Sequence, residues 1–372
     1  MNFLIVTHVP HFNDRSYYSA YAPYVNEMNV WAKHVEKLVI MAPLAIGTKS
    51  AIDSAYNHSN IQFIAIENFN LLTVKNAVNA IIKLPLISWK MFKAMQNSDH
   101  IHLRCPGNMG LIGCFLQILF PHKIKTAKYA GNWDPSSKQP WTYKLQSWIL
   151  SNRFLTRNMT VLVYGDWNNA TANIKSFFTA TYSQNEIVPI SLPIEKKSFQ
   201  FVFVGALVKG KNPLYAIQLI ERLFSNGYEV SLKLFGEGVE RTTLESYIIT
   251  NQLSSYISLE GNQNRAALKQ AYQQSQFVLL PSNSEGWPKA IAEGMFWGCI
   301  PIATAVSCVP YMLDYGKRGL LLEMDIDHDT IKIGNFLTDL AAMHDMQNEA
   351  SSWSRQYTLE RFETEIKSLL YP

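Results

Sequence analysis

The 372-residue sequence has few charged residues, few cysteines and no long apolar run. Charged residues make up 17% and hydrophobic residues 48%, which excludes an intrinsically disordered chain. The four cysteines form no C-x-x-C pair and no histidine cluster has zinc-ligand spacing, so we expect reduced, buried thiols and no metal. Glycine and proline, at 18 and 16, are too few for a collagen-like or low-complexity polymer.

The sequence also lacks a membrane-spanning segment. Its longest apolar run, 111–120, contains Gln117 and ends before Pro121. This is short of the ~20 apolar residues that a spanning helix needs. The first eight residues carry no basic segment, and we expect them to form a first β-strand rather than a signal peptide. These features predict a cytoplasmic protein that touches a membrane only from its surface.

The net charge of +4 hides an asymmetry. Residues 1–190 carry 17 Lys and Arg against 9 Asp and Glu, whereas residues 191–372 carry 16 against 20. The basic part also holds six of the nine tryptophans, and its segment 75–93 mixes lysines with Trp89 and Phe92. A basic amphipathic helix of this kind is typical of contact with an anionic membrane. The alternative is an ordinary crossover helix with its apolar face on a sheet.

Apolar runs alternate with amphipathic segments along the whole chain. This pattern predicts parallel sheets covered by helices on both faces, the doubly wound α/β arrangement. In the first half we expect strands at 3–6, 38–41, 61–64, 100–103, 126–129 and 161–164, with helices at 74–95 and 143–155. A linker is predicted at 189–200. The alternation then restarts, with strands at 201–204, 231–235, 256–259, 277–280 and 300–303 and helices at 213–225, 242–250, 266–274 and 288–297.

The strongest motif is the segment 282–294, which follows the apolar run at 277–280. It places Glu285 in a strand-to-helix loop, Pro288 at the first helical position and Glu293 about one and a half turns further on. Free amides at a helix start bind anions, helped by the helix dipole. Two carboxylates on either side of an anion site suit a sugar nucleotide, which has hydroxyls at both ends and phosphates between. The alternative is that both glutamates are solvated surface charges.

The stretch 201–323 resembles the C-terminal domain of the GT-B fold, retaining glycosyltransferases of family 4, also called glycosyl transferases group 1. The resemblance rests on short pieces in the family's order: F-V-G-A-L-V-K-G-K-N-P at 203–213, L-F-G-E-G at 234–238, L-E-G at 259–261, the E-x7-E pair at 285 and 293, G-C-I-P-I-A at 298–303 and Y-G-K-R-G-L-L at 315–321.

The resemblance implies a role for each matching residue. Glu285 would bind the donor sugar, Glu293 the ribose, and Lys211 the diphosphate, so that Glu285 and Lys211 are the catalytic candidates. A cation at the leaving diphosphate stabilises charge that develops in the transition state. The family's neighbouring arginine is replaced by Ala206, for which Lys209 would compensate. The donor-binding candidates are Gly205, Lys209, Lys211, Gly286, Trp287, Pro288, Lys289 and Glu293.

The first half matches the family less well. The glycine-rich turn after the first strand is replaced by 8–15, where Pro10 and Asn13-Asp14 predict a turn. The family's acceptor-side histidine is replaced by Y-A-G-N-W-D at 129–134. For one candidate, Arg104, the alternative is pairing within its loop, and for another, His11, it is a solvated loop position. The acceptor-side candidates are Asn132, Asp134, Arg104 and His11.

The implied architecture is two Rossmann-like domains facing across a cleft, an acceptor-side domain over 1–190 and a nucleotide-sugar domain over 198–350, with a helix over 353–372 packing back on the first. The implied reaction moves a hexose-type sugar from a UDP- or GDP-sugar, with retention, to a hydroxyl of a lipid-linked or glycan acceptor in envelope or exopolysaccharide synthesis. No cofactor, metal or nucleic-acid partner is expected. The alternatives are a sugar-nucleotide epimerase or hydrolase of the same fold, and a non-catalytic sugar-nucleotide-binding subunit.

Overall fold

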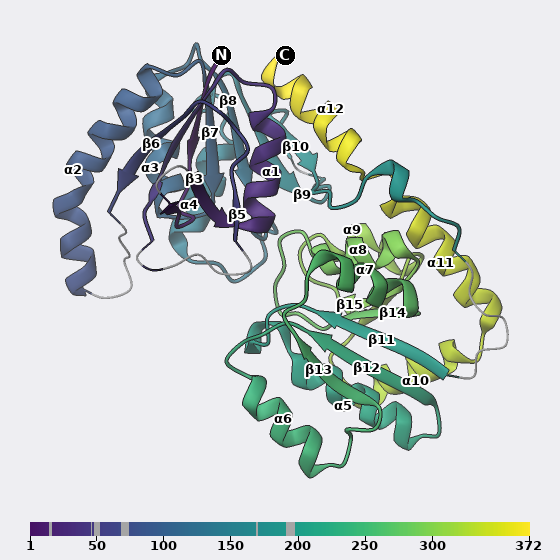
Figure 1. The fold of residues 1–372 in the computed structure, drawn as a ribbon. Coiled ribbons are helices and arrows are strands. Elements are labelled where there is room, and N and C mark those ends of the chain that lie inside the picture. Colours follow the sequence, from purple (N-terminus) through teal and green to yellow (C-terminus); the bar gives the residue numbers. More distant parts are fainter. Residues whose placement is uncertain (15–16, 46, 48–52, 68–73, 169, 191–197) are drawn as a thin grey trace. The chain divides into compact units, whose positions relative to one another are not determined.

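The computed structural model describes residues 1–14, 17–45, 47, 53–67, 74–168, 170–190 and 198–372. It divides into two compact units (Figure 1). Unit 1 comprises Met1–Phe178 together with Phe362–Pro372, and unit 2 comprises Thr179–Arg361. Each unit is built on its own parallel sheet, which confirms the predicted α/β class with two Rossmann-like domains.

Unit 1 has a seven-stranded parallel sheet in the order β10-β9-β8-β7-β1-β4-β6. Its strands are four to seven residues long, and most are apolar runs because both faces of the sheet are covered, whereas β8 and β10 also contain lysines. The predicted runs all form strands, and β10 is an additional strand at one edge. The bounds are β1 Asn2–Val6, β4 Lys37–Pro43, β6 Ile61–Ile66, β7 His100–Cys105, β8 Ile124–Tyr129, β9 Met159–Tyr164 and β10 Ile174–Phe177.

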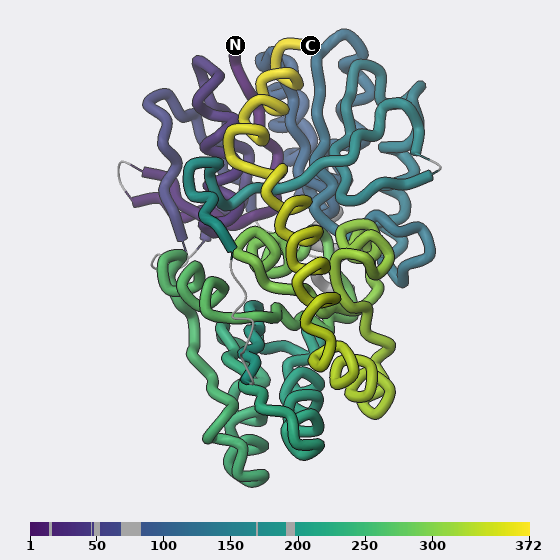
Figure 2. Tube along the Cα trace, turned by 90° about the vertical axis from the view of Figure 1, so that its right-hand side faces the viewer, coloured from purple at the N-terminus to yellow at the C-terminus, as the bar shows by residue number. Residues whose placement is uncertain are grey.

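Helices cover both faces of this sheet. Helices α2 (Val74–Gln96), α3 (Asn108–Leu116) and α4 (Trp141–Ser151) pack on one face, and the short helix η1 (Gln117–Leu119) continues α3. On the other face α1 (Ala22–Ala32) stacks Trp31 on Phe3, with ring centroids 5.4 Å apart. Helix α12 (Leu359–Leu370) joins that face through the contact of Phe362 with Phe177. Both chain termini lie at one end of unit 1 (Figure 2).

A small antiparallel sheet in unit 1 was not predicted. It contains β2 (Phe12–Asp14), β3 (Tyr17–Tyr21) and β5 (Asp53–Ala55). The turn predicted at Asn13-Asp14 is therefore wrong, because these residues pair with β3 in strand β2. Three-residue strands give almost no periodic signal, so turn-forming residues dominated the prediction.

Unit 2 has a six-stranded parallel sheet in the order β13-β12-β11-β14-β15-β16. Its strands are β11 Ser198–Val204, β12 Glu229–Phe235, β13 Ile257–Gly261, β14 Phe277–Leu280, β15 Ile300–Thr304 and β16 Leu320–Leu322. The helices are α5 Pro213–Ser225, α6 Arg241–Thr250, α7 Arg265–Gln274, α8 Lys289–Trp297, α9 Val309–Met312, α10 Ile326–Leu337 and α11 Leu340–Ser354, with short helices η2 Gln184–Glu186, η3 Lys209–Lys211 and η4 Asp314–Gly316.

The division into units differs from the predicted domain limits of 190 and 353. Unit 2 begins at Thr179, because the segment after β10 packs on α8 through Tyr182, whose ring lies 5.1 Å from that of Phe296. The last helix begins at Leu359 rather than at Trp353, which stacks on Trp287 within unit 2. Of the predicted linker at 189–200, residues 198–200 begin β11 and residues 191–197 lie outside the described residues.

Candidate functional site

The loop after β11 is held against the loop after β12 by direct backbone contacts. The Gly205 amide donates to the Phe235 carbonyl at 2.9 Å, and the Leu207 amide donates to the Glu237 carbonyl at 2.9 Å. A Cβ on Gly236 would lie 1.9 Å from the Gly205 carbonyl oxygen, and Gly236 has a φ of +143°. Only glycine fits such an approach. The L-F-G-E-G motif therefore fixes the position of the loop that carries Gly205, Lys209 and Lys211.

That loop is also tied to the loop after β14. The Asn283 amide donates to the Gly210 carbonyl at 2.9 Å, and the Asn212 side chain donates to the Pro281 carbonyl at 2.8 Å. Asn212 itself has a left-handed conformation with a φ of 48°, which asparagine tolerates. Two loops at the carboxyl ends of neighbouring parallel strands are thereby joined, which is where open α/β sheets bind ligands.

Lys211 and Glu285 meet at this junction. Their Nζ and Oε1 atoms are 2.5 Å apart, and the Glu285 side chain is only 7% exposed. The alternative of Glu285 as a solvated loop charge is therefore wrong. A buried carboxylate is stable only when it is paired, so each residue holds the other in place. Lys209, by contrast, is exposed.

The loop 281–288 leads directly into α8. The Gly286 carbonyl accepts a hydrogen bond from the Cys308 thiol at 3.0 Å, which anchors the loop. Helix α8 begins at Lys289, so Pro288 is the N-cap and not the first helical residue. A proline N-cap has no side-chain acceptor for the first-turn amides. Accordingly, no capping side chain accepts a hydrogen bond from an amide of this turn. The Ile291 amide of this turn donates to the Pro288 carbonyl at 3.0 Å, and a helix start without a capping side chain is a common place for proteins to bind anions.

Trp287 is placed differently from the other donor-binding candidates. Its side chain is buried, and its indole stacks on that of Trp353 with centroids 6.1 Å apart. Tyr357 meets the same indole edge-on at 5.7 Å. The Trp287 side chain therefore supports the loop from the interior of unit 2, and any contact of this residue with a donor would come from its backbone.

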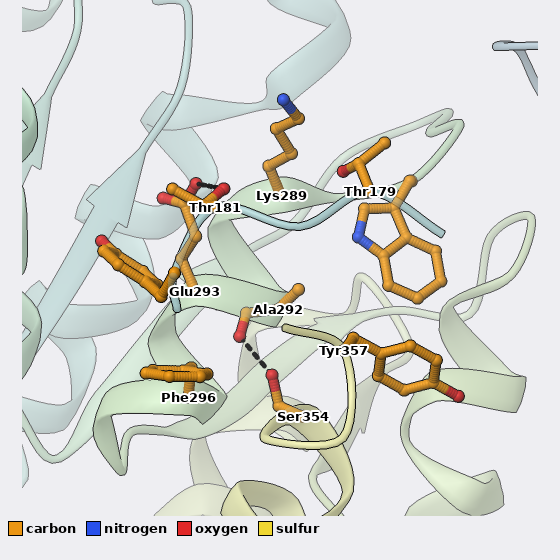
Figure 3. Close-up of a pocket in the computed structure, with 10 residues that line it drawn as sticks. Thr179, Thr181, Lys289, Ala292, Glu293, Phe296, Ser354 and Tyr357 are labelled. Atoms are coloured by element: carbon orange, nitrogen blue, oxygen red, sulfur yellow. Dashed lines mark hydrogen bonds between the residues drawn. The ribbon is translucent and has the colours of Figure 1, made fainter. Parts of the chain in front are cut away.

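Glu293 lines a small pocket of unit 2 (Figure 3). Its Oε1 accepts a hydrogen bond from the Thr181 hydroxyl at 2.7 Å, and its Oε2 accepts one from the Tyr272 hydroxyl at 3.4 Å. Burial raises the pKa of the Glu293 carboxyl, against the lowering effect of the Thr181 hydrogen bond and of Lys289. The pocket holds about 20 Å³, room for roughly one water molecule. Sequence reasoning missed Thr181 and Tyr272, because neither lies in a recognisable motif.

Helix α11 holds α8 from the opposite side of this pocket. The Ser354 hydroxyl donates to the Ala292 carbonyl at 2.6 Å, as Figure 3 shows, and the Arg355 guanidinium donates to the Phe296 carbonyl at 3.1 Å. These contacts fix the orientation of the helix on which Glu293 lies.

Two of the acceptor-side candidates are part of the interior of unit 1. His11 is fully buried, with Nδ1 2.7 Å from the Val9 carbonyl and Nε2 2.9 Å from the Tyr56 hydroxyl. Burial lowers the pKa of His11 to about 4, so the ring is neutral at pH 7. The structure therefore places His11 in the core rather than in a solvated loop or on a surface that an acceptor reaches.

Arg104 also has a partner inside unit 1. Its guanidinium lies 3.6 Å from the Glu27 carboxylate and above the Tyr24 ring. Lys128, which is fully buried, lies 3.9 Å from the same carboxylate. Arg104 thus belongs to a charge cluster with Glu27 and Lys128, which agrees with the alternative of an internally paired arginine, although its partner is on α1.

Asn132 and Asp134 lie together in a cavity of unit 1 of about 540 Å³. The Asp134 amide donates to the Asn132 side-chain oxygen at 2.9 Å. Gln139 accepts from the Tyr129 hydroxyl and donates to the Asn132 carbonyl, so the loop is internally braced. Three tryptophans and several hydroxyl groups complete the lining: Trp133, Trp148, Trp167, Ser137, Ser147 and Ser151. Aromatic faces beside amides and hydroxyls are the chemistry that binds sugar rings.

Among the residues that the structure describes, no three or more His, Cys, Asp or Glu side chains gather as a metal site would require. No helix in the described ranges is long and apolar enough to cross a bilayer. The expectation that no metal is needed and the contact with a membrane stay predictions.

Two Rossmann-like units, with a lysine–glutamate pair beside an uncapped helix start, define the class as the GT-B fold of glycosyltransferases. Solved structures agree. Anabaena Alr3699/HepE, in complex with UDP and glucose, has a TM-score of 0.69 at 13% identity, covering 100% of this chain and 99% of that chain. Sucrose-phosphate synthase from Thermosynechococcus elongatus has a TM-score of 0.69 at 14% identity, and the match covers 100% of this chain and 98% of that chain. Identities this low show the fold alone.

Residues 184–353, less than half of the chain, match the family model described as Glycosyl transferases group 1. An uncharacterized glycosyltransferase of Methanocaldococcus jannaschii is 30% identical over 34% of this chain and 35% of that protein. The GtfA subunit of a UDP-N-acetylglucosamine–peptide N-acetylglucosaminyltransferase from Streptococcus pneumoniae is 26% identical over 41% of this chain and 33% of its own length. Each match thus spans about a third of the relative.

Proposed function

We propose that this protein is a retaining glycosyltransferase that moves a hexose-type sugar from a UDP- or GDP-sugar to a hydroxyl of a glycan or lipid-linked acceptor. The observation that carries the proposal is the contact of Lys211 with the buried Glu285 carboxylate, beside the first turn of α8. Lys211 and the α8 amides would receive the charge of the leaving diphosphate, while Glu285 binds the sugar hydroxyls. Similarity to proteins solved with UDP and glucose supports a uridine nucleotide.

The proposed mechanism needs no group from outside the chain and its two substrates. The bond from the anomeric carbon to the diphosphate breaks, and the acceptor oxygen attacks from the same face as the diphosphate departs. The acceptor proton passes to the leaving phosphate oxygen. Lys211 would stabilise the charge on that phosphate where it develops, and Glu293 would bind the ribose in place of its hydrogen bond with Thr181.

For the acceptor we propose a glycan bound in the cavity that Asn132 and Asp134 line. Trp148 is 61% exposed at this cavity and would stack on a sugar ring. We place the reaction in envelope or exopolysaccharide synthesis at the cytoplasmic face of a membrane. A relative from Salmonella typhimurium, a putative colanic acid biosynthesis glycosyltransferase, is 27% identical over 36% of this chain and supports that setting.

A donor screen tests the proposal directly. Thermal unfolding is measured with UDP-, GDP- and ADP-sugars, and a ligand at 100 times its dissociation constant is expected to add about 2.7 kcal/mol of stability. The best donor is then incubated with oligosaccharide acceptors, and the anomeric configuration of the product is read by NMR. Donor binding without transfer to any acceptor would favour the non-catalytic subunit, and release of free or epimerised sugar without acceptor would favour the hydrolase or epimerase.

The acceptor cavity is tested by two tryptophans of the same helix. Trp148→Ala is expected to raise the acceptor KM about two- to ten-fold, because aromatic stacking contributes about 0.5–1.5 kcal/mol. Trp141→Ala is the matched control, since Trp141 is 71% exposed on α4 but does not line the cavity. The donor dissociation constant should stay unchanged in both. Equal effects of the two substitutions on acceptor KM would contradict the assignment.

A further inference from the structure

The first residues of unit 2, Thr179–Thr181, form a short segment across the Glu293 pocket, which we call the strap. Thr179 and Thr181 line this pocket, and Figure 3 shows the Thr181 hydroxyl joined to the Glu293 carboxylate. The pocket holds about 20 Å³, which is room for roughly one water molecule. A ribose ring with its two hydroxyl groups is much larger than that. The strap therefore closes the pocket against the group that Glu293 is proposed to bind.

Both oxygens of the Glu293 carboxylate accept hydrogen bonds from hydroxyl groups of the chain. The Thr181 hydroxyl lies 2.7 Å from Oε1, and the Tyr272 hydroxyl lies 3.4 Å from Oε2. Tyr272 is fully buried on α7, so the packing of unit 2 fixes its hydroxyl. Thr181 lies in neither a helix nor a strand. Of the two contacts, the one with Thr181 is thus the one that a ligand can replace.

The strap has few polar contacts that hold it in place. Among the described residues, none makes a backbone–backbone hydrogen bond with residues 179–181. The Thr179 side chain is 7% exposed, and its hydroxyl has no hydrogen-bond partner in the part of the chain that the structure describes. Moving the strap therefore costs little hydrogen bonding beyond the contact of Thr181 with Glu293.

The chain on either side of the strap is anchored. Before it, the Phe178 carbonyl accepts a hydrogen bond from the buried Lys128 ammonium at 3.1 Å. After it, the Leu359 amide donates to the Tyr182 carbonyl at 3.0 Å, and the Tyr182 ring packs on that of Trp297 with centroids 4.8 Å apart. A three-residue segment between two such anchors can shift while the helices and strands around it stay in place.

We propose that the Thr181 hydroxyl competes with the ribose for Glu293, so that the strap lowers the affinity of the protein for its nucleotide-sugar donor. A ribose hydroxyl offers the same group as Thr181, an O–H that donates to a carboxylate oxygen. When the donor binds, the strap shifts, the hydrogen bond from Thr181 to Glu293 breaks, and a ribose hydroxyl takes its place. This role rests on the proposed function, in which Glu293 binds the ribose. If Thr181 instead oriented Glu293 for the ribose, its removal would weaken binding rather than strengthen it.

Single hydroxyl groups are removed to test this role, and binding of UDP and GDP to the full chain is measured by calorimetry. Thr181→Val keeps the shape of the side chain and removes the competing donor. A hydrogen bond to a charged group contributes about ten-fold or more to an equilibrium constant, so the nucleotide that binds is expected to bind about ten-fold more tightly. Thr179→Val is the matched control, because it removes a hydroxyl of the same strap that has no partner, and it should leave the affinity unchanged.

A nucleotide without ribose hydroxyls identifies the group that replaces Thr181. The 2′,3′-dideoxy form of the same nucleotide has no hydroxyl to donate to Glu293, so its affinity should be equal for the wild type and Thr181→Val. Thr181→Ser retains the hydroxyl and should bind the ordinary nucleotide as the wild type does. If Thr181→Val is insoluble, the comparison of the two nucleotides is made on Thr181→Ala.

The outcomes separate this role from the proposed activity. Unchanged or weaker nucleotide binding by Thr181→Val, or an equal gain for the dideoxy nucleotide, would show that Thr181 does not compete, and the transferase proposal would stand. If neither nucleotide binds to any of these proteins, both proposals fail, because Glu293 is then not a ribose site.

Discussion

Replacing Lys211 with methionine is expected to lower the transfer rate by about 10²–10³-fold, the effect of removing one charge-stabilising donor from an active site. The Lys211 ammonium is the cation that contacts the buried Glu285 carboxylate, and no second cation contacts Glu285 among the ion pairs of the described residues. Methionine keeps the length of the stem and removes the charge. The rate is measured at saturating donor and acceptor, so that a loss in kcat is separated from a loss in binding.

The variant also leaves Glu285 buried without its partner, which lowers stability. The double variant Lys211→Met with Glu285→Gln removes both charges and should recover most of the lost melting temperature, but none of the activity. Lys317→Met, an exposed lysine of unit 2, is the control and should retain wild-type rates. Near-normal turnover of the single variant, or recovery of activity in the double variant, would remove Lys211 from the mechanism.

Gly236→Ala is expected to destabilise unit 2 by roughly 3 kcal/mol or more, because the new Cβ meets the Gly205 carbonyl and the positive φ is strained for alanine. Gly210→Ala, in the very loop that Gly236 supports, is the matched control. A Cβ on Gly210 meets nothing within 4 Å, and its φ is not in the left-handed region. We expect Gly210→Ala to be neutral or slightly stabilising.

Thermal unfolding of the three proteins, followed by tryptophan fluorescence, measures this difference. One kcal/mol corresponds to about 2–4 °C for a unit of this size. If Gly236→Ala is insoluble while Gly210→Ala is produced normally, Gly238→Ala provides the second measurement, since its Cβ would lie 2.3 Å from the Leu207 carbonyl oxygen. A folded Gly236→Ala protein that melts with the wild type would show that the two loops separate without cost.

Most of the parallel sheets could be predicted from the sequence, and the reason is burial. Runs such as 277–280 are apolar throughout because both faces of the sheet are covered, and β14 and α5 have the predicted bounds. The antiparallel strands β2, β3 and β5 escaped prediction because they are three to five residues long and half exposed. Helix α10 was not predicted, although Asp325 caps its start by accepting from the Asp327 and His328 amides.

The candidate site could be predicted where the residues that carry the chemistry lie within short sequence motifs. Lys211 and Glu285 were found by motif, and the structure adds that they touch and that Glu285 is buried. Thr181 was not found, because it comes from an irregular segment and reaches Glu293 only through the packing of the fold. His11 is the opposite case, a residue for which the local sequence was misleading. Its loop composition predicted an exposed side chain, but Tyr56, 45 residues away in the sequence, packs on it and buries it.

The chain leaves unit 1 after Phe178 and returns to it at Phe362. Unit 2 is thus an uninterrupted insertion, whereas unit 1 is assembled from two separated pieces of sequence. An expression fragment of unit 2 needs one start and one stop, but unit 1 alone requires residues 362–372 to be fused back onto residue 178. Recombination between relatives that exchanges unit 2 while keeping unit 1 therefore needs two crossovers. A single crossover near residue 190 would leave α12 matched to a foreign sheet.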